Sequence, residues 1–370
     1  MSDKSLSLHY NKYLDLDKVL SAQNPLSGKG SEAAHDEMLF IIIHQTYELW
    51  FKQIIHEMDS VMDLLNKETV NEEKLGLFVS RLERINTIIE TLVKQIDILE
   101  TMTSLDFLEF RNHLSPASGF QSHQFRKLEV MLGLKIKNRH QFGGCPYHSQ
   151  FDGVKKEEIL SLEENTSLFN LVEKWLERIP FLNIDGFNFI NEYEVAVNKM
   201  MDNEILNITT SDYLNSEDKI LRTKMIDDNR KYFDKVFDEN SHHEAIIKGE
   251  TSLSYKATMS ALLINLYRDE PILHLPYKFL RSIVEMDHQI ATWRFRHVQM
   301  VEKMLGQKIG TGGSSGQGYL KETVDKHKLF TDLTNISTLM ISRSYLPKLP
   351  KTIKKQLAFN FTSDGTQLTK

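Results

Sequence analysis

The chain has 370 residues and a mass of 43.0 kDa, which suits one large domain or one domain with a smaller insertion. Hydrophobic residues make up 41% and charged residues 26%, as in globular proteins with a sizeable core. A net charge of −6 gives no electrostatic basis for binding nucleic acid. No apolar run approaches the roughly 18 residues of a membrane span, and the polar start MSDKSLSLHY is unlike a signal peptide. A single cysteine, Cys145, excludes an internal disulfide framework, so we expect a reduced, cytoplasmic setting without membrane contact.

Helical periodicity dominates the chain. Only 17 glycines and 8 prolines interrupt it, which favours long helices over many short strands. No alternating strand pattern is found, so the sequence predicts an all-α helical bundle. Apolar residues recur at helical spacing over about 35–65, 71–101, 104–113, 118–132, 166–178, 187–201, 218–238, 255–268 and 275–305, with two further helices near 317–344.

Two regions differ from this pattern. Residues 187–249 are richer in charge and are predicted to form a small helical insertion, which leaves 1–186 and 250–370 as the main helical domain. Residues 138–153 lack periodicity, so we expect a long loop there.

The first long helix carries a histidine among aromatic residues. Phe40, His44, Tyr47 and Phe51 fall on one helical face, so the His44 imidazole is expected to point into an apolar or aromatic space. A lone histidine in such a place is more often a hydrogen-bonded core residue than a ligand. Both interpretations stay open at this point.

A break between two helices follows in FRNHLSPASGFQSHQFR, residues 110–126. Ser115 or Ser118 can cap the second helix, and Arg111 and Arg126 flank the break. An arginine at a junction between helices can bind a carboxylate through two hydrogen bonds. The ordinary alternative for either arginine is a surface salt bridge.

The tract WRFRHVQMVEKMLGQKIGTGGSSG, residues 293–316, places a second histidine on an apolar stripe. Apolar residues recur there at spacings of three and four, so they share one face of a long helix. This pattern predicts that the His297 imidazole is buried and needs a hydrogen-bond or ligand partner. Gly306 is expected to end this helix in the left-handed conformation. A glycine-rich loop then follows, and a buried imidazole beside such a loop suggests a cofactor site. The residues of the stripe are Met286, Ile290, Trp293, His297, Met300, Val301 and Met304.

Other apparent motifs carry little weight. Residues 312–316 match the GxSxG pattern of a nucleophile elbow, but a helix and not a strand precedes them. The same loop lacks the last glycine of GxGxxG. His242 and His243 are adjacent, so they point in different directions on a helix and favour a solvated face over a metal site.

Taken together, these segments resemble the tryptophan 2,3-dioxygenase family, whose members are haem enzymes. The resemblance rests on HDEMLFIIIHQTYELWFKQI, LETMTSLDF, FRNHLSPASGFQSHQFR and the run from WRFRH through GTGGSSGQGYL. These tracts are spread from about residue 10 to about residue 345, so nearly the whole chain is covered.

The resemblance implies a haem b that is ferrous in the active form and bound without covalent attachment, in keeping with the absence of CxxCH. It implies that the substrates are L-tryptophan and O2, with the indole C2–C3 bond cleaved to give N-formyl-L-kynurenine. It also implies a homotetramer in which the N-terminal segment of one subunit completes the site of its neighbour.

Roles for individual residues follow from the same resemblance. His297 matches the axial ligand of the haem iron, and Trp293, Ser118 and Gly119 match residues at the cofactor. His44 matches the histidine that accepts a hydrogen bond from the indole N–H, and we favour positioning over proton removal. The expected substrate contacts are Arg111 to the carboxylate, Thr311 to the ammonium group, Phe40, Tyr47 and Phe51 around the indole ring, and Tyr10 and Tyr13 from a neighbouring subunit.

Three alternatives remain at this level. One is a haem-binding relative that senses or stores haem or tryptophan without oxygenating it. A haem-free helical interaction protein would use both histidines as core residues. A related oxygenase would act on another indole.

Overall fold

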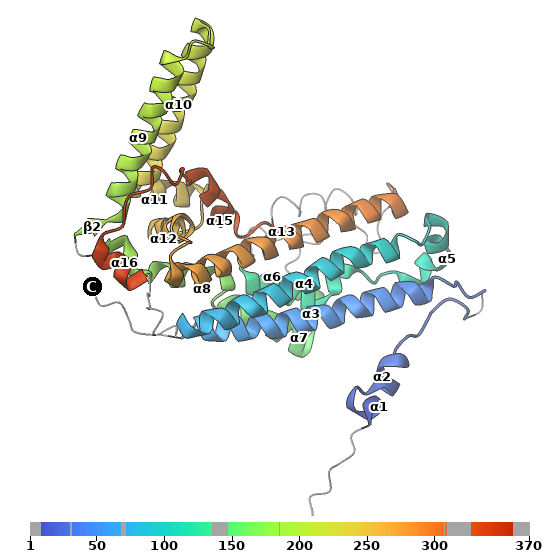
Figure 1. Ribbon diagram of the computed structural model, residues 1–370. Coiled ribbons are helices and arrows are strands. Elements are labelled where there is room, and N and C mark those ends of the chain that lie inside the picture. The colour runs from blue at the N-terminus through green and yellow to red at the C-terminus, as the bar shows by residue number, and fades with distance from the viewer. Residues whose placement is uncertain are drawn as a thin grey trace, which may run out of the picture.

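The computed structural model describes residues 9–29, 32–67, 72–134, 147–184, 186–306, 308 and 327–357 (Figure 1). Within these ranges the chain is almost wholly helical, so the prediction of an all-α fold is confirmed. The strands found there are two-residue segments, β1 (Asn183–Ile184) and β2 (Phe187–Asn188), which pair antiparallel with Ile184 opposite Phe187.

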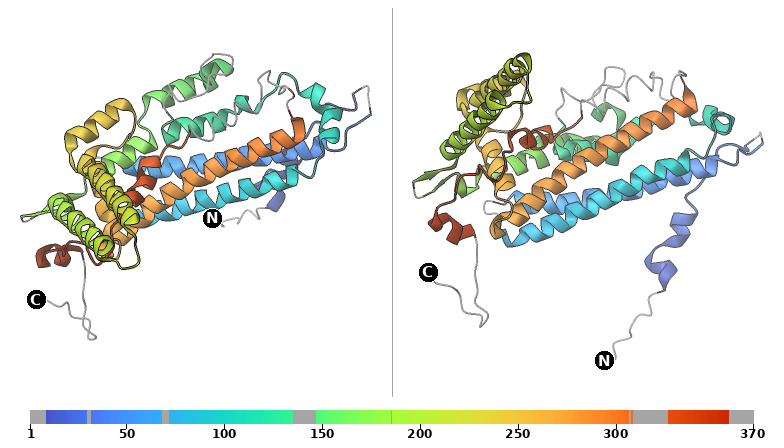
Figure 2. Two further views of the ribbon diagram at one scale, coloured as in Figure 1. Left: turned by 90° about the horizontal axis from the view of Figure 1, so that it is seen from above. Right: turned by 45° about the horizontal axis from the view of Figure 1, so that its top comes forward.

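Three long helices form the centre of the molecule: α3 (Glu37–Leu65), α4 (Leu75–Leu99) and α13 (Pro271–Leu305). They run side by side, with α4 against both α3 and α13, as all the views show (Figures 1 and 2). Buried side chains of α4 recur at helical spacing, among them Phe78, Leu82 and Ile85 at no more than 1% exposure. These apolar side chains are buried where α4 packs against α3 and α13, and this burial is the main stabilisation of the three long helices.

Shorter helices surround this layer. The remaining α-helices of the described chain are α1 (Tyr10–Tyr13), α2 (Leu16–Leu20), α5 (Ser104–Leu114), α6 (His123–Leu132), α7 (Gly153–Glu164), α8 (Leu168–Glu177), α9 (Phe189–Thr210), α10 (Ser216–Phe237), α11 (Glu239–Lys248), α12 (Tyr255–Leu266), α15 (Thr331–Asn335) and α16 (Lys351–Leu357). The 3-10 helices are η1 (Glu72–Lys74), η2 (Gly119–Gln121), η4 (Tyr147–Gln150), η5 (Pro180–Leu182) and η6 (Ile336–Leu339).

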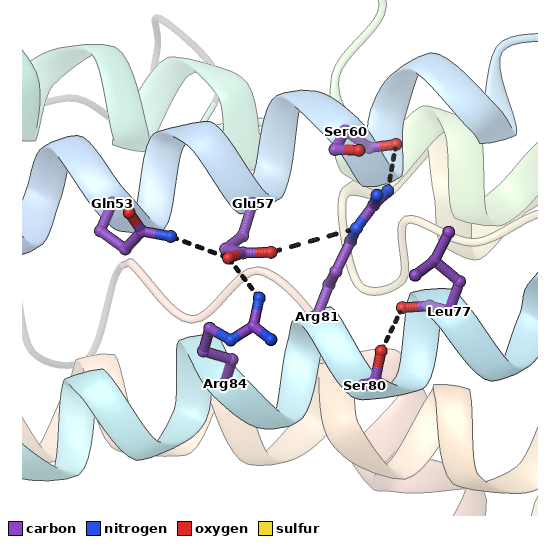
Figure 3. A network of polar contacts seen from close by, with 7 residues as sticks. All are labelled: Gln53, Glu57, Ser60, Leu77, Ser80, Arg81 and Arg84. Carbon is purple, nitrogen blue, oxygen red and sulfur yellow. Dashed lines mark hydrogen bonds and ion pairs between the residues drawn. The ribbon is translucent and has the colours of Figure 1, made fainter. Parts of the chain in front are cut away.

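Buried polar contacts fix the position of α3 relative to α4. Glu57 of α3 is 5% exposed and accepts a hydrogen bond from Arg84 of α4 at 2.6 Å (Figure 3). Arg81 lies 4.0 Å from the other carboxylate oxygen, and Gln53 donates to Glu57 at 2.8 Å. This network lies within the helix pair and touches none of the residues predicted for the site.

The helices α9 and α10 form an antiparallel pair that projects from the bundle, as the green and yellow arm in Figure 1 shows. They occupy most of 187–249, whose assignment as a separate insertion stays a prediction. The C-terminal region crosses the base of this arm: the Tyr193 hydroxyl donates to the Leu339 carbonyl, and Asn203 donates to the Tyr345 hydroxyl at 3.2 Å.

Some predicted boundaries were wrong. The helix expected from residue 187 begins at Phe189, because 187–188 pair with the preceding strand, and it extends to Thr210. Of the loop expected over 138–153, residues 138–146 lie outside the described ranges, whereas 147–150 form η4 and α7 begins at Gly153. Helices α1, α2, α7 and α16 were not predicted. No helix in the described ranges is long and apolar enough to cross a membrane.

Candidate functional site

The first part of the candidate site is the aromatic face of α3. Phe40, His44, Tyr47 and Phe51 follow one another at spacings of three and four residues, so they form one stripe. The rings of Phe40 and His44 lie 4.1 Å apart, and those of Tyr47 and Phe51 lie 6.2 Å apart. The stripe predicted from the sequence is therefore present, with His44 at its centre.

The hydrogen bonding of His44 defines its tautomer. Its Nδ1 lies 2.7 Å from the carbonyl oxygen of Phe40, one helical turn earlier, and a carbonyl can only accept. Nδ1 therefore carries the proton. Burial lowers the pKa of His44, while the Phe40 carbonyl and nearby Glu48 oppose the shift, so the ring is neutral at pH 7. The neutral ring leaves Nε2 with a lone pair, as a hydrogen-bond acceptor.

The His44 side chain is exposed to solvent, yet protein atoms surround it closely enough for desolvation to lower its pKa. Both hold for a ring that has protein on most sides and one open edge.

The second part of the site is His297 on α13. Its ring is half-buried and stacks on Trp293, with 5.7 Å between ring centroids and 13° between planes. Burial, together with the neighbouring His44, lowers the pKa of His297 to about 4. The two imidazoles are thus close enough for a charge on one to oppose a charge on the other. Within the described ranges no hydrogen bond of the His297 ring is found, so its lone pair is available to a ligand.

An aromatic wall joins three helices beside these histidines. Trp293 lies 6.0 Å from the rings of both Tyr47 and Phe51, and 5.1 Å from Phe125 of α6. Phe51 and Phe125 lie 5.3 Å apart. The Tyr47 hydroxyl donates to the Leu92 carbonyl of α4 at 2.8 Å, and burial raises its pKa to about 12. The Trp293 N–H is near enough to Tyr47 to oppose that rise, although it donates no hydrogen bond within the described residues.

The break between α5 and α6 is tied to the same part of α3. Ser118 caps η2 by accepting from the Phe120 N–H at 3.4 Å, so the cap expected for the second helix belongs to the 3-10 helix that precedes α6. Ser122 caps α6 and donates to Glu48 at 2.6 Å, and Gln124 donates to the Glu48 backbone carbonyl at 2.7 Å. Glu48 follows Tyr47 directly, so these bonds hold Ser118 and Gly119 near the aromatic stripe.

Arg111 lies half-buried in the last turn of α5. The preceding residue, Phe110, is fully buried and lies 5.5 Å from Phe40 in an edge-on contact, while Phe107 lies 5.8 Å from Phe40. The α5 helix therefore brings Arg111 to the end of the stripe that carries Phe40 and His44.

Arg126 forms a buried ion pair and not the surface salt bridge considered from the sequence. It is 6% exposed and binds Glu129 at 2.7 Å, and Arg294 of α13 binds the other oxygen of Glu129 at 2.7 Å. Sequence analysis missed Glu129 and Phe125. The spacing of three residues between Arg126 and Glu129, which suits a helical ion pair, was the available signal.

The remaining predicted residues are not brought to this place by the described chain. Tyr10 and Tyr13 lie on α1 with 68% and 71% exposure. Figures 1 and 2 show α1 and α2 away from the three-helix layer. Thr311 and the glycine-rich loop lie outside the described residues. Gly306 does end α13 with a positive φ of 56°, as expected, but its ψ of −126° differs from the left-handed helical conformation.

Fold and site together define a class of protein: an all-helical protein in which two neighbouring neutral imidazoles lie among aromatic side chains, a donor set that suits haem iron. The family model described as tryptophan 2,3-dioxygenase matches residues 1–340. The chain is similar to the tryptophan 2,3-dioxygenase of Bdellovibrio bacteriovorus, at 46% identity over 96% of this chain and 99% of the relative. It is 48% identical to that of Dictyostelium discoideum over 95% of this chain and 88% of the relative. The mouse relative is 43% identical over 97% of this chain and 88% of its own length.

The chain therefore belongs to the tryptophan 2,3-dioxygenase family. Membership of this family implies a haem cofactor.

Proposed function

We propose that this protein cleaves the indole C2–C3 bond of L-tryptophan with O2 and releases N-formyl-L-kynurenine. Both oxygen atoms enter the product, which balances the reaction without a further reductant. The observation that carries the proposal is the pair of neutral imidazoles, His44 and His297, in a chain that matches this family over residues 1–340.

The residues at His297 fit a haem group. A pKa of about 4 keeps the ring neutral, and a neutral imidazole is the form that ligates iron. Trp293 stacks on the ring and restricts its rotation. At Gly119 an added Cβ would meet no atom within 4 Å, which is compatible with a flat group at Ser118 and Gly119. We propose non-covalent haem b with His297 as the axial ligand. When bound in its ferrous form, the haem supplies the O2 and redox chemistry.

His44 is proposed to orient the substrate. Because Nδ1 is committed to the Phe40 carbonyl, Nε2 is the atom that can accept a hydrogen bond from the indole N–H. The low proton affinity of a partly buried imidazole favours holding this proton in a hydrogen bond over removing it. His44 thus fixes which edge of the indole faces the cofactor.

The other groups are proposed to bind the rest of the amino acid. Phe40, Tyr47 and Phe51 surround the ring with apolar surface and exclude water. Arg111 binds the carboxylate through its planar guanidinium, and Thr311 meets the ammonium group.

We further propose that the protein is a homotetramer in which Tyr10 and Tyr13 complete a neighbouring site. Both tyrosines are largely exposed on a short helix that extends from the bundle (Figure 1). Exposed aromatic rings on such an extension suit a contact with a second copy. The cytoplasmic setting expected from the sequence stays a prediction.

The test follows the visible spectrum of the reduced, haem-reconstituted protein with L-tryptophan and O2 while N-formylkynurenine is measured. A Soret band with product formation is expected. A Soret band without product would favour a haem-binding relative that does not oxygenate tryptophan. The absence of a Soret band would indicate that His44 and His297 are core residues and not parts of a haem site. Faster product formation from another indole than from L-tryptophan would show that the other indole is the preferred substrate.

The variant His297→Ala addresses the iron ligand directly. We expect it to lose stable haem binding, because the apolar stripe of α13 carries no imidazole besides His297 and His44 is proposed to face the substrate. Normal haem occupancy with intact activity would remove His297 from the role of ligand.

A further inference from the structure

Glu129 lies at the meeting point of three elements behind the aromatic wall. It is 3% exposed on α6 and binds Arg126 of the same helix at 2.7 Å. Its other oxygen binds Arg294 of α13 at 2.7 Å and lies 3.5 Å from Nδ1 of His327. His327 is where the described chain resumes after residue 308. One carboxylate therefore joins α6, α13 and the returning chain.

This carboxylate is charged despite its burial. Desolvation alone raises the pKa of a buried carboxyl group, but Arg126 and Arg294 outweigh it and hold the pKa of Glu129 at about 2. A buried charge of this kind requires its partners in place, because moving one guanidinium away leaves uncompensated charge in the interior. The cluster thus resists relative movement of α6 and α13.

The two guanidinium groups also hold an aromatic ring of the wall. The guanidinium carbon of Arg126 lies 4.9 Å from the centroid of the Phe125 ring, and that of Arg294 lies 5.7 Å from it. Phe125 in turn lies 5.1 Å from Trp293, whose indole is stacked on His297. Contacts therefore run without a gap from Glu129 through the arginines, Phe125 and Trp293 to the His297 imidazole.

We infer that Glu129 is a positioning residue for His297: by fixing Arg294 and Phe125 it fixes Trp293 and the orientation of the imidazole. This inference rests on the proposed function, since the orientation matters because His297 is proposed to ligate iron. Outer partners that orient a ligating histidine typically change metal affinity by about 10–100-fold when they are replaced. Glu129 acts on His297 through three intervening layers, namely the arginines, Phe125 and Trp293, and it touches no reacting group.

Glu57 provides a matched control. It is also a buried carboxylate, at 5% exposure, and two arginines surround it at 2.6 and 4.0 Å (Figure 3). It joins α3 to α4 and contacts none of the aromatic wall. Glu57→Gln therefore reproduces the loss of a buried charge without disturbing the contacts that lead to His297.

The experiment compares Glu129→Gln, Glu129→Asp and Glu57→Gln as reconstituted holoproteins. The first measurement is the rate at which haem transfers to an excess of an apo-globin acceptor. The second is the iron–histidine stretching band of the reduced protein, recorded by resonance Raman spectroscopy. We expect Glu129→Gln to lose haem about 10–100-fold faster than wild type and to shift the band. Glu129→Asp, which keeps the charge, should restore part of both. Glu57→Gln should match wild type in the band.

A second readout needs no haem. The chain has three tryptophans, so 5-fluorotryptophan labelling gives three fluorine resonances, and Trp293→Phe assigns the one at the wall. We expect Glu129→Gln to shift the Trp293 resonance and Glu57→Gln to leave it unchanged.

The inference is overturned if Glu129→Gln and Glu57→Gln behave alike in haem loss, in the stretching band and in the fluorine spectrum. If Glu129→Gln does not fold, Arg294→Lys replaces it, because lysine keeps the charge beside Glu129 but not the planar guanidinium beside Phe125. Wild-type behaviour of Arg294→Lys in all three measurements would equally overturn the inference. Failure of wild type to take up haem would instead contradict the proposed function. The fluorine spectrum would still decide whether Glu129 fixes Trp293.

Discussion

The neutral state of His297 has a consequence for the stability of the haem-free protein. Burial and the neighbouring His44 lower the pKa of His297 from 6.5 to about 4. A group that is harder to protonate in the folded state than in the unfolded state favours unfolding when the pH falls. The contribution is negligible well above pH 6.5, grows as the pH drops below it, and is complete below about pH 4.

The size of the effect follows from the two pKa values. Linkage gives a loss of about 2 kcal/mol in the free energy of unfolding between pH 7 and pH 5 from this one residue. That is a large share of the roughly 5–15 kcal/mol by which proteins of ordinary stability stay folded. His44, whose pKa is also lowered, adds to the loss in the same direction.

The assay is urea unfolding of haem-free protein at pH 7 and pH 5, for wild type and His297→Gln. The chain has 14 histidines, so the total loss of wild type has many sources and only the difference is informative. Wild type should lose about 2 kcal/mol more than the variant over this interval. Equal losses in the two proteins would show that His297 is not held in a desolvated, neutral state, and would remove the argument that it fits iron.

Three further predictions concern the substrate and the wall. Arg111→Leu should raise the KM for tryptophan about 10–150-fold, the equivalent of the roughly 1.5–3 kcal/mol of a charge-assisted hydrogen bond; an unchanged KM would exclude Arg111 from the site. His44→Ala should keep its Soret band but lose turnover and discrimination between tryptophan and 1-methyltryptophan, which lacks the N–H; unchanged activity would make His44 a core residue. Tyr47→Phe removes the bond to the Leu92 carbonyl and should lower the unfolding free energy by about 0.5–1.5 kcal/mol, and a larger loss in urea unfolding would mean that the helix pair itself had shifted.

Local sequence patterns predicted the elements of the fold better than the contacts between them. The stripe of Phe40, His44, Tyr47 and Phe51 was readable because helical spacing alone places these residues on one face. The tautomer of His44 also follows from local structure, since its partner is the carbonyl one turn earlier. The proximity of His44 to His297 was not readable, because the packing of α3, α4 and α13 brings together residues more than 250 positions apart.

The boundaries and the buried charges were harder to predict for a physical reason. Helix α7 has only one buried residue, Ile159, so it lacks the apolar stripe by which helices are recognised. The spacing of three residues suits an ion pair between Arg126 and Glu129 on one helix, but nothing in the segment around Arg294 shows that the same carboxylate, on another helix, neutralises it. Such long-range compensation depends on the tertiary fold.

The arrangement of charge across the aromatic wall explains how the protein interior holds both a charged cluster and a neutral imidazole. On one side Glu129, Arg126 and Arg294 form a charged cluster that is stable because every member faces an opposite charge. On the other side His297 has no such partner, and burial with the neighbouring His44 keeps it neutral. Phe125 and Trp293 lie between them, in contact with the arginines on one face and with the imidazole on the other. A polar replacement in this wall would bring charge and water towards His297. The wall therefore keeps the imidazole neutral as well as holding it in position.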